Sequence, residues 1–422
     1  MLTAEIIAIG SELLTPEKTD TNSLWLTEKL NGIGIEVMLK TIVGDDESRL
    51  LETIKDALKR SDVVITTGGL GPTEDDITRQ VAAKAVGLEL EYHPEVEALL
   101  RERFRSWGRE MPEINKRQAY VIEGSTVLPN PNGSAVGMLL RIGEKILGIL
   151  PGPPREMQPM FADFVLPELT KLSGEVVVRR RILKVSGMGE SAVDAVVAPI
   201  YQAYPNVRTA ILFNKTEVEI HIYAKAAVEA DAEATLDELS GKLVDALGIA
   251  VFSTDGETME QVIGRMLSDT GKTLSVAESC TGGLIGRRIT EVPGSSAYFM
   301  EGAVTYSNEA KVRTLIVSPE TLEKHGAVSG ETAEEMAAGM LERAATDYAI
   351  SVTGIAGPDG GSAQKPVGTV FIGYADAART KHLRIVIPGD RYLIRWRASQ
   401  AALDYLRRQM LKNRKNVVTL GG

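Results

Sequence analysis

The sequence of 422 residues contains a single cysteine, Cys280, and four histidines, which are scattered along the chain at His93, His221, His325 and His382. One cysteine cannot form a disulfide within the chain, and a zinc site built from cysteine and histidine is not expected. Because the histidines are scattered along the sequence, catalysis by a histidine paired with a nearby serine or cysteine is also disfavoured. Any hydrolysis would then depend on a lysine, a carboxylate or a metal-bound water as the base.

The chain also lacks long apolar segments and an excess of positive charge. No apolar run approaches the ~20 residues of a membrane span, and the first strand-like stretch begins without the features of a signal peptide. The 47 Lys and Arg residues are outnumbered by 57 Asp and Glu residues, which gives a net charge of −10. These features predict a cytoplasmic protein without membrane contact, and they argue against nucleic acid as a partner.

Strand-like and helix-like patterns alternate in two regions, and a different pattern separates them. The alternation predicts mainly parallel sheets with functional groups at the carboxyl ends of the strands. The middle region has eight Lys and Arg against twelve Asp and Glu and reads as a small α+β module. We therefore predict a multi-domain α/β protein: an α/β/α sandwich over residues 1–171, an α+β connector over 172–255, and a second α/β/α domain over 256–416.

A glycine-rich segment, Thr67–Pro72, follows a buried strand of the first region. Glycines at this position let the backbone approach a ligand and direct N–H groups at phosphate. Thr73 is predicted to cap the following helix, with Asp75 and Asp76 in its first turn, where carboxylates can hold a divalent ion against a diphosphate. A tight turn with helix-capping acids is the alternative interpretation. The three glycines are Gly68, Gly69 and Gly71.

Other polar, turn-rich segments of the first region also follow strands or open helices. In an open α/β sheet these positions converge on one edge, where ligands bind. The candidate ligand-binding residues in these segments are Glu12, Asp20, Asn22, Asn132, Ser134, Gly152 and Glu156.

The segment Thr67–Pro72 has the pattern T-G-x-x-G-P, and the same pattern occurs in the C-terminal region at Thr353–Pro358. The C-terminal region also contains further polar motifs. A lysine can act as a base when burial or a neighbouring positive charge lowers its pKa. Tyr306 and Lys311 lie five residues apart, across a strand end and the first turn of a helix, so both can reach one pocket. The other motifs are Ala277–Gly283, Pro293–Ser296 and Lys365–Thr369.

The segments Thr66–Gln80 and Pro151–Met157 resemble the molybdopterin-binding-type domain of the competence/damage-inducible CinA family. The resemblance implies an ADP-ribose pyrophosphatase that uses a divalent metal such as Mg²⁺, with K⁺ as a further candidate cofactor and Asp75 or Asp76 near the metal. The family usually has a glycine where this chain has Thr15–Lys18. An alternative is therefore a non-catalytic sensor domain that binds a nucleotide or a pterin.

The C-terminal motifs resemble the nicotinamide mononucleotide deamidase domain of the same family, which needs no cofactor. The resemblance implies that Ser296 is the nucleophile, Lys311 the base and Tyr306 a proton-relay partner. It also implies substrate binding by Glu278, Ser279, Thr281, Gly282, Thr353, Gly354 and Arg391.

Several alternatives stay open at these positions. Ser279 is the main rival of Ser296 as the nucleophile, and Ser296 then caps a turn. Cys280 is a further candidate, although a free cysteine without a nearby histidine is more often a small buried residue. Lys311 could also be a solvated helix lysine.

The middle region resembles the KH-like connector of the family, but it is acidic and lacks the basic GxxG loop that grips nucleic acid. The resemblance implies a homodimer that acts on small nucleotides, namely nicotinamide mononucleotide and ADP-ribose. A scaffold for DNA uptake is disfavoured by the negative charge.

Overall fold

The computed structural model describes residues 2–174, 176–214 and 216–420, with side chains described as far as residue 413. The chain forms two compact units: one contains residues up to 179 together with 224–234, and the other contains 180–223 and 235 onwards. Each is described separately below. Among the described residues, no helix combines the length and apolar character that crossing a membrane requires.

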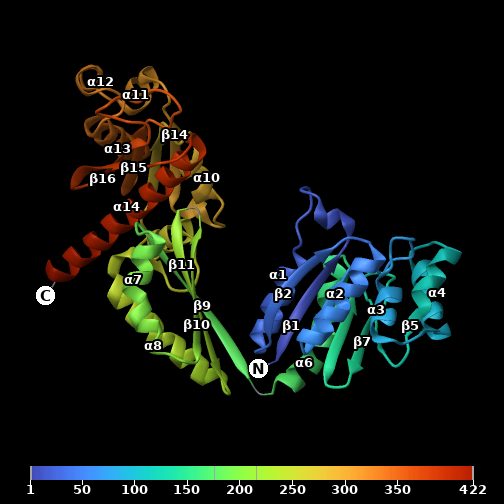
Figure 1. Ribbon diagram of the computed structural model, residues 1–422. Helices are drawn as coiled ribbons and strands as arrows, with labels where there is room; N and C mark the ends of the chain where they lie inside the picture. The colour runs from blue at the N-terminus through green and yellow to red at the C-terminus, as the bar shows by residue number, and fades with distance from the viewer. Residues whose placement is uncertain (1, 175, 215, 421–422) are drawn as a thin grey trace. The chain divides into compact units, whose positions relative to one another are not determined.

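A six-stranded sheet forms the centre of the first unit, in the order β2-β1-β3-β8-β7-β6 (Figure 1). The strands β1, β2, β3 and β8 run parallel, whereas β6 and β7 are antiparallel additions at one edge. The central strands are nearly continuous runs of β-branched and other apolar residues, as expected for strands that are covered on both faces. The strands are β1 (Thr3–Ile9), β2 (Glu36–Val43), β3 (Val63–Thr67), β6 (Thr126–Leu128), β7 (Gly137–Ile142) and β8 (Lys145–Leu150).

Helices cover both faces of this sheet and create two separate cores. On one face, α2 buries Leu50, Ile54 and Ala57, which recur at helical spacing, and packs beside α3 and α4. On the other face, α1 packs with the continuous helical stretch that includes α5 and α6. The helical elements are η1 (Ser11–Leu14), α1 (Asn22–Gly32), α2 (Glu47–Arg60), α3 (Thr78–Val86), α4 (Pro94–Ser106), η2 (Glu113–Ala119), α5 (Pro154–Met160), η3 (Phe161–Val165) and α6 (Leu166–Ser173). The strands β4 (Leu90–Tyr92) and β5 (Tyr120–Ile122) form a separate antiparallel pair, with α4 and η2 between them in the sequence.

The connector contains a four-stranded sheet in the order β10-β11-β9-β12. Strand β11 alternates between buried and partly exposed residues, which is the pattern of a sheet with one covered face. The elements are β9 (Val177–Ser186), α7 (Glu190–Tyr201), β10 (Val207–Asn214), β11 (Glu217–Ala226), α8 (Glu229–Leu247), η4 (Gly248–Ala250) and β12 (Val251–Ser253).

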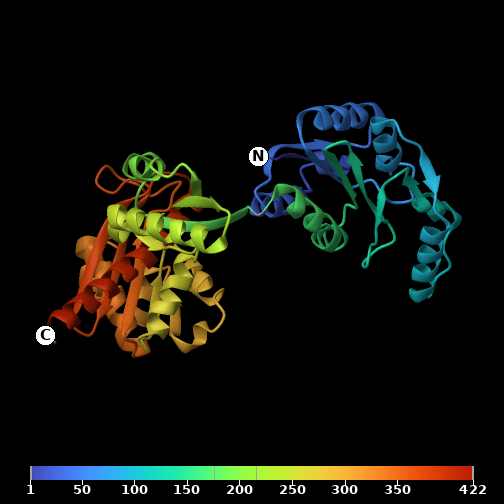
Figure 2. The same ribbon diagram turned by 90° about the horizontal axis from the view of Figure 1, so that it is seen from below.

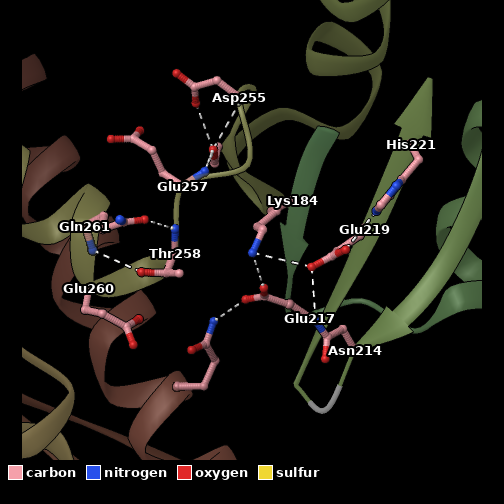
Figure 3. A network of polar contacts seen from close by, with 12 residues as sticks. Lys184, Asn214, Glu217, Glu219, His221, Asp255, Glu257, Thr258, Glu260 and Gln261 are labelled. Carbon is pink, nitrogen blue, oxygen red and sulfur yellow. Dashed lines mark hydrogen bonds and ion pairs between the residues drawn. The ribbon is translucent and has the colours of Figure 1, made fainter. Parts of the chain in front are cut away.

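A polar network inside the second unit joins the connector sheet to the C-terminal helix (Figure 3). The Lys184 amine lies 2.9 Å from a Glu217 carboxylate oxygen and 3.4 Å from Glu219. The other Glu217 oxygen accepts a hydrogen bond of 3.1 Å from the Gln400 amide. Burial raises the pKa of Glu217 because it disfavours the charged carboxylate. The contacts with Lys184 and Gln400 stabilise the charged form.

The C-terminal domain has a five-stranded sheet in the order β14-β13-β15-β16-β17, whose strands run from gold to dark orange along the colour bar of Figure 2. Strand β13 runs parallel to both β14 and β15, and β16 and β17 continue the sheet in antiparallel fashion. The strands are β13 (Leu274–Glu278), β14 (Phe299–Val304), β15 (Tyr348–Gly354), β16 (Thr369–Asp376) and β17 (Arg379–Val386).

Helices again cover both faces of the sheet. One core contains buried residues of α9, α10 and α14, and a second contains residues of α13 with Leu315 and Val317. The helices are α9 (Met259–Ser268), α10 (Leu284–Thr290), η5 (Ser295–Ala297), α11 (Asn308–Leu315), α12 (Pro319–His325), α13 (Gly330–Ala344) and α14 (Arg391–Leu420).

The predicted multi-domain α/β architecture is confirmed, and the domain boundaries at 171/172 and 255/256 stay a prediction. Two local predictions are wrong. Helix α3 begins at Thr78, so Thr73 does not cap it and Asp75 and Asp76 lie before its first turn. Strand β14 ends at Val304, so Tyr306 lies beyond the strand. After β3 a separate turn precedes the helix, whereas after β14 a short irregular segment leads to Ser307, whose side chain caps α11.

The Lys184 network generates a stability prediction. Replacing Lys184 with Ala leaves two partly buried carboxylates without their cation, so we expect a loss of about 2 kcal/mol in the free energy of unfolding. Lys242→Ala is the matched control because Lys242 pairs with Glu238 at the surface, and we expect no measurable loss from it. Urea denaturation followed by tryptophan fluorescence measures both. Equal stability of the two variants would contradict a stabilising role for Lys184.

Candidate functional site

Lys311 and Ser279 meet where β13 and β14 end side by side. Glu278, the last residue of β13, pairs with Val304, the last residue of β14, so the segments that follow both strands leave the sheet together. The Lys311 Nζ atom lies 3.1 Å from the Ser279 Oγ atom. The two residues are 32 positions apart in the sequence. They come together because β13 and β14 are parallel neighbours and because α11 follows directly after β14.

Two backbone carbonyls fix the amine of Lys311. Its Nζ atom donates to the Thr305 carbonyl at 2.9 Å and lies 3.5 Å from the Tyr306 carbonyl. A neutral amine has two N–H donors and one lone pair, so these carbonyls can take the donors while the lone pair accepts the Ser279 hydroxyl proton. The arrangement therefore suits a lysine that activates a serine.

Lys311 is only 1% exposed, and burial lowers the pKa of its ammonium group. No carboxylate forms an ion pair with it among the described residues, so only neutral hydrogen-bond partners offset the cost of burying the charge. A larger fraction of Lys311 is consequently neutral near pH 7 than for a solvated lysine. The interpretation of Lys311 as a solvated helix residue is wrong.

Cys280 lies next to Ser279 but points into the core formed by α9, α10 and α14. Burial raises the pKa of its thiol to about 12. A thiol with this pKa is almost entirely protonated at neutral pH and is a poor nucleophile. The structure agrees with the interpretation of Cys280 as a buried structural residue.

Tyr306 and Arg391 lie at the open rim of this site. The Arg391 guanidinium donates to the Tyr306 hydroxyl at 3.0 Å and to the Gly357 carbonyl at 2.8 Å. Tyr306 is 60% exposed, and Arg391 begins α14. A cation held in this way at the mouth of a site is suited to bind a phosphate group.

Glu278 and Thr353 have structural hydrogen bonds that the sequence did not reveal. The Glu278 carboxylate accepts from the backbone N–H groups of Gly283, Ile285 and Gly286 at 2.9–3.1 Å, and so it caps the N-terminus of α10. The Thr353 hydroxyl donates to the Ala327 carbonyl at 2.6 Å. Both side chains line the region of the site, but their first role is to hold its backbone.

The structure does not bring Ser296 to Lys311. Ser296 is exposed in η5, before the amino end of β14, whereas Lys311 follows the carboxyl end of the same strand. A strand of six residues rises about 17 Å, so the two residues lie at opposite edges of the sheet. This geometry favours Ser279, the alternative nucleophile.

Arg395 is a residue that the sequence did not point to. Its guanidinium donates to the Thr281 carbonyl at 2.6 Å, which anchors the loop that carries Ser279. A side chain at Gly282 would approach the same guanidinium. Gly354 is the last residue of β15 and pairs with Val370 of β16. The hydroxyl of Thr281 is buried without a partner among the described residues. No sequence signal joins Arg395 to a loop that lies 114 residues earlier.

In the first unit, Asn22 ties together three of the predicted segments. Its amide donates to the Thr67 hydroxyl at 3.0 Å and to the Gly152 carbonyl at 2.7 Å. Gly68 follows Thr67 with φ +112°, and a Cβ atom there would overlap the Ile9 carbonyl oxygen, so only glycine fits between β3 and β1. The predicted convergence of these segments at one sheet edge is present.

A second polar group of this unit is built on Glu156. The Asn130 amide donates to the Glu156 carboxylate at 2.7 Å, and the Asn132 amide donates to the Arg155 carbonyl at 2.7 Å. Ser134 lines a cavity of about 320 Å³ beside α4. These residues connect the Asn130–Ser134 loop to the start of α5.

The remaining predicted residues have local partners. The Asp76 carboxylate accepts from the Thr73 backbone N–H at 2.9 Å and from its hydroxyl at 2.6 Å, which closes the turn after the glycine segment. Asp20 accepts from the Ser23 N–H at the start of α1. Glu12 is exposed and pairs with Lys18 at 3.5 Å. Gly69 and Gly71 pack closely against Thr78 and Asp76.

The predicted metal ligands Asp75 and Asp76 do not form a protein cage. Among the described residues there is no group of three or more His, Cys, Asp or Glu side chains that could hold a metal. One Asp76 oxygen is already used by Thr73, and Asp75 is exposed. The residues present fit only an ion such as Mg²⁺ that takes most of its ligands from water and phosphate.

Comparison with known proteins identifies three consecutive domains. The description "Probable molybdopterin binding domain" matches residues 5–171, "Damage-inducible protein CinA KH domain" matches 180–253, and "CinA C-terminal domain" matches 256–410. The CinA-like protein of Solibacter usitatus is 47% identical over 407 residues, which cover 96% of this chain and 98% of the relative. The CinA-like protein of Kosmotoga olearia is 43% identical over 408 residues, with coverage of 97% and 99%.

Solved structures of similar proteins correspond to parts of the chain. The competence/damage inducible protein CihA from Agrobacterium tumefaciens is 44% identical, with a TM-score of 0.34, and covers 35% of this chain and 93% of its own. The protein CinA from Thermoplasma acidophilum is 28% identical, with a TM-score of 0.37, and covers 40% of this chain and 98% of its own.

Proposed function

The chain belongs to the competence/damage-inducible CinA family, and from this membership and the contact between Ser279 and Lys311 we propose a function for its C-terminal domain. The domain hydrolyses the amide of nicotinamide mononucleotide and gives nicotinate mononucleotide and ammonia. The chain thus acts in the salvage of pyridine nucleotides. The observation that carries the proposal is the buried lysine amine 3.1 Å from a serine hydroxyl at the carboxyl edge of a parallel sheet.

The first half of the reaction forms an acyl-enzyme. The Ser279 Oγ atom attacks the amide carbon while the hydroxyl proton passes to the neutral Lys311 amine, and a tetrahedral intermediate forms. The Lys311 ammonium then gives this proton to the amide nitrogen. The C–N bond breaks, ammonia leaves, and the nicotinoyl group remains on Ser279 as an ester.

The second half regenerates the enzyme. A water molecule attacks the ester carbon, Lys311 accepts its proton, and the C–O bond to Ser279 breaks as the serine oxygen is protonated again. One water is consumed and one ammonia is released. Lys311 accepts and returns one proton in each half-reaction, so it ends in the neutral form in which it began. No cofactor enters this scheme.

The rim residues orient the substrate. Arg391 offers its guanidinium to the nucleotide phosphate, and it also donates a hydrogen bond to the Tyr306 hydroxyl. This placement makes Tyr306 a positioning or proton-relay residue that depends on Arg391 for its orientation. Glu278, Arg395 and Thr353 act indirectly because they hold the loops that carry the reacting groups.

The choice of nucleophile is tested by comparing serine and lysine variants. Ser279→Ala and Lys311→Ala should each lower kcat for ammonia release about a thousandfold or more, because each removes one half of the reacting pair. Ser296→Ala and the buried control Cys280→Ala should retain activity within about threefold. Release should be insensitive to EDTA. An inactive Ser296→Ala beside an active Ser279→Ala would assign the nucleophile to Ser296 instead.

The buried amine also predicts a pH dependence. Since burial lowers the pKa of Lys311 and only the neutral amine accepts a proton, kcat/KM should rise with pH as Lys311 deprotonates. The midpoint should lie below ~10.4, the pKa of a solvated lysine. Measurement between pH 7 and 10 avoids the phosphate titration near pH ~6. A rate that falls with pH over this range would refute Lys311 as the base.

For the N-terminal domain we propose hydrolysis of ADP-ribose with a divalent metal. The convergence of Asn22, Thr67, Gly68 and Gly152 at one sheet edge supports a ligand site there. Mg²⁺ would be held by Asp75 or Asp76 together with phosphate oxygens, and it would supply charge neutralisation at the diphosphate. The segment Thr15–Lys18, which departs from the family pattern, favours the alternative of a non-catalytic sensor that binds a nucleotide or a pterin.

Turnover of ADP-ribose separates these two proposals. We expect the purified protein to release AMP and ribose phosphate with Mg²⁺ and to lose this activity in EDTA. Asp76→Asn should reduce the rate at least tenfold, because it weakens both the turn and the metal contact. Binding of ADP-ribose without turnover at any metal concentration would support the sensor.

A further inference from the structure

A cavity of about 480 Å³ lies in the first unit, between the carboxyl-terminal part of the Thr66–Gln80 segment and residues that no prediction above includes. Its walls come from α2, α3, the turn that follows β3, η2 and the β4–β5 pair. This volume lies within the range of pockets that hold small organic ligands. Its polar, charged and apolar lining residues include Thr73, Arg79, Lys84, Leu90, Arg117 and Tyr120.

Arg79 forms the floor of this cavity and is 1% exposed. Its Nη2 atom donates to the Leu70 carbonyl at 3.0 Å, and its Nε atom has no partner among the described residues. Burial lowers the pKa of the guanidinium to about 10, which still leaves it charged at neutral pH. Attraction by the nearby Asp76 carboxylate offsets part of the cost of burying this cation, and an anion in the cavity would offset more of it.

Two further cations stand at the rim. Arg117 pairs with Glu74 at 2.6 Å, and Lys84 pairs with Glu47. All four side chains are between 44% and 81% exposed, so these ion pairs are weak and their cations can turn towards another anion. The rim thus offers two movable positive charges above one fixed positive charge.

Aromatic and aliphatic side chains also line the cavity. Tyr120 is 41% exposed, and its ring is tilted against that of Tyr92 at a centroid separation of 5.6 Å. Leu90 and Ile77 are further apolar lining residues. A half-exposed aromatic ring that is supported from behind can stack on a flat ring of a ligand.

We propose that this cavity binds a phosphomonoester that carries an aromatic ring, with its phosphate at Arg79, Arg117 and Lys84 and its ring against Tyr120. The site is separate from Ser279 and Lys311, and it does not depend on the deamidase proposal. Its three cations lie on α3 and η2, so ligand binding would also link these two elements to the turn at Thr73.

Isothermal titration calorimetry on the full chain tests this site with adenosine monophosphate and inorganic phosphate as probes. Arg117→Ala and Lys84→Ala should each weaken binding of both probes about five- to tenfold. Tyr120→Ala should weaken adenosine monophosphate binding and leave phosphate binding unchanged, which separates ring recognition from binding of free phosphate. Arg141→Ala is the matched control, since Arg141 is a half-exposed arginine paired with Glu168 at the other side of the unit.

Arg79 itself is tested by a conservative pair. Arg79→Gln should abolish phosphate binding, and Arg79→Lys should restore part of it; circular dichroism checks that both variants are folded. If Arg79→Gln does not fold, the surface variants at positions 84, 117 and 120 decide. Wild-type affinity in all three surface variants, or no heat from either probe at millimolar concentration, would overturn the proposal. Ammonia release from nicotinamide mononucleotide, measured on the same preparations, reports separately on the deamidase.

Discussion

The burial of one amine constrains the whole C-terminal domain. Lys311 is tolerated inside the protein because the carbonyls of Thr305 and Tyr306 accept its N–H groups, and these carbonyls are available because β14 stops at Val304. The parallel register of β13 and β14 then delivers Ser279 to the remaining lone pair. A shift of one residue in this register would direct Ser279 to the opposite face of the sheet and separate the pair.

The loops around this amine are held by polar groups that do no chemistry themselves. Glu278 uses its carboxylate to close the first turn of α10, and Arg395 holds the intervening Thr281 carbonyl from the last helix. A loop fixed from both sides keeps the Ser279 hydroxyl in place, as the proposed acyl transfer would require. In the first unit, Asn22 has a comparable role, because one amide joins the ends of β3 and β8 to the start of α1.

The sequence was sufficient for the architecture. Alternating patterns predicted the two α/β domains, and polar motifs after strands predicted at which edge of each sheet these polar segments meet. The sequence could not choose between Ser279 and Ser296, because both follow plausible turns and only the strand register shows which one reaches Lys311. It also missed Arg79, since one arginine in an amphipathic helix gives no sign that its guanidinium is buried.

Helix α14 contacts three functional regions of the second unit in sequence order. Arg391 meets Tyr306 at the rim, Arg395 meets the Thr281 loop, and Gln400 bonds to Glu217 of the connector. Nine residues separate Arg391 from Gln400, which places them on opposite faces of the helix and about 13.5 Å apart along its axis. A rotation of α14 about its axis would therefore move its contacts with Tyr306 and with the connector in opposite directions. The hydrogen bond between Gln400 and Glu217 thus helps to fix the rotational setting at which Arg391 meets Tyr306.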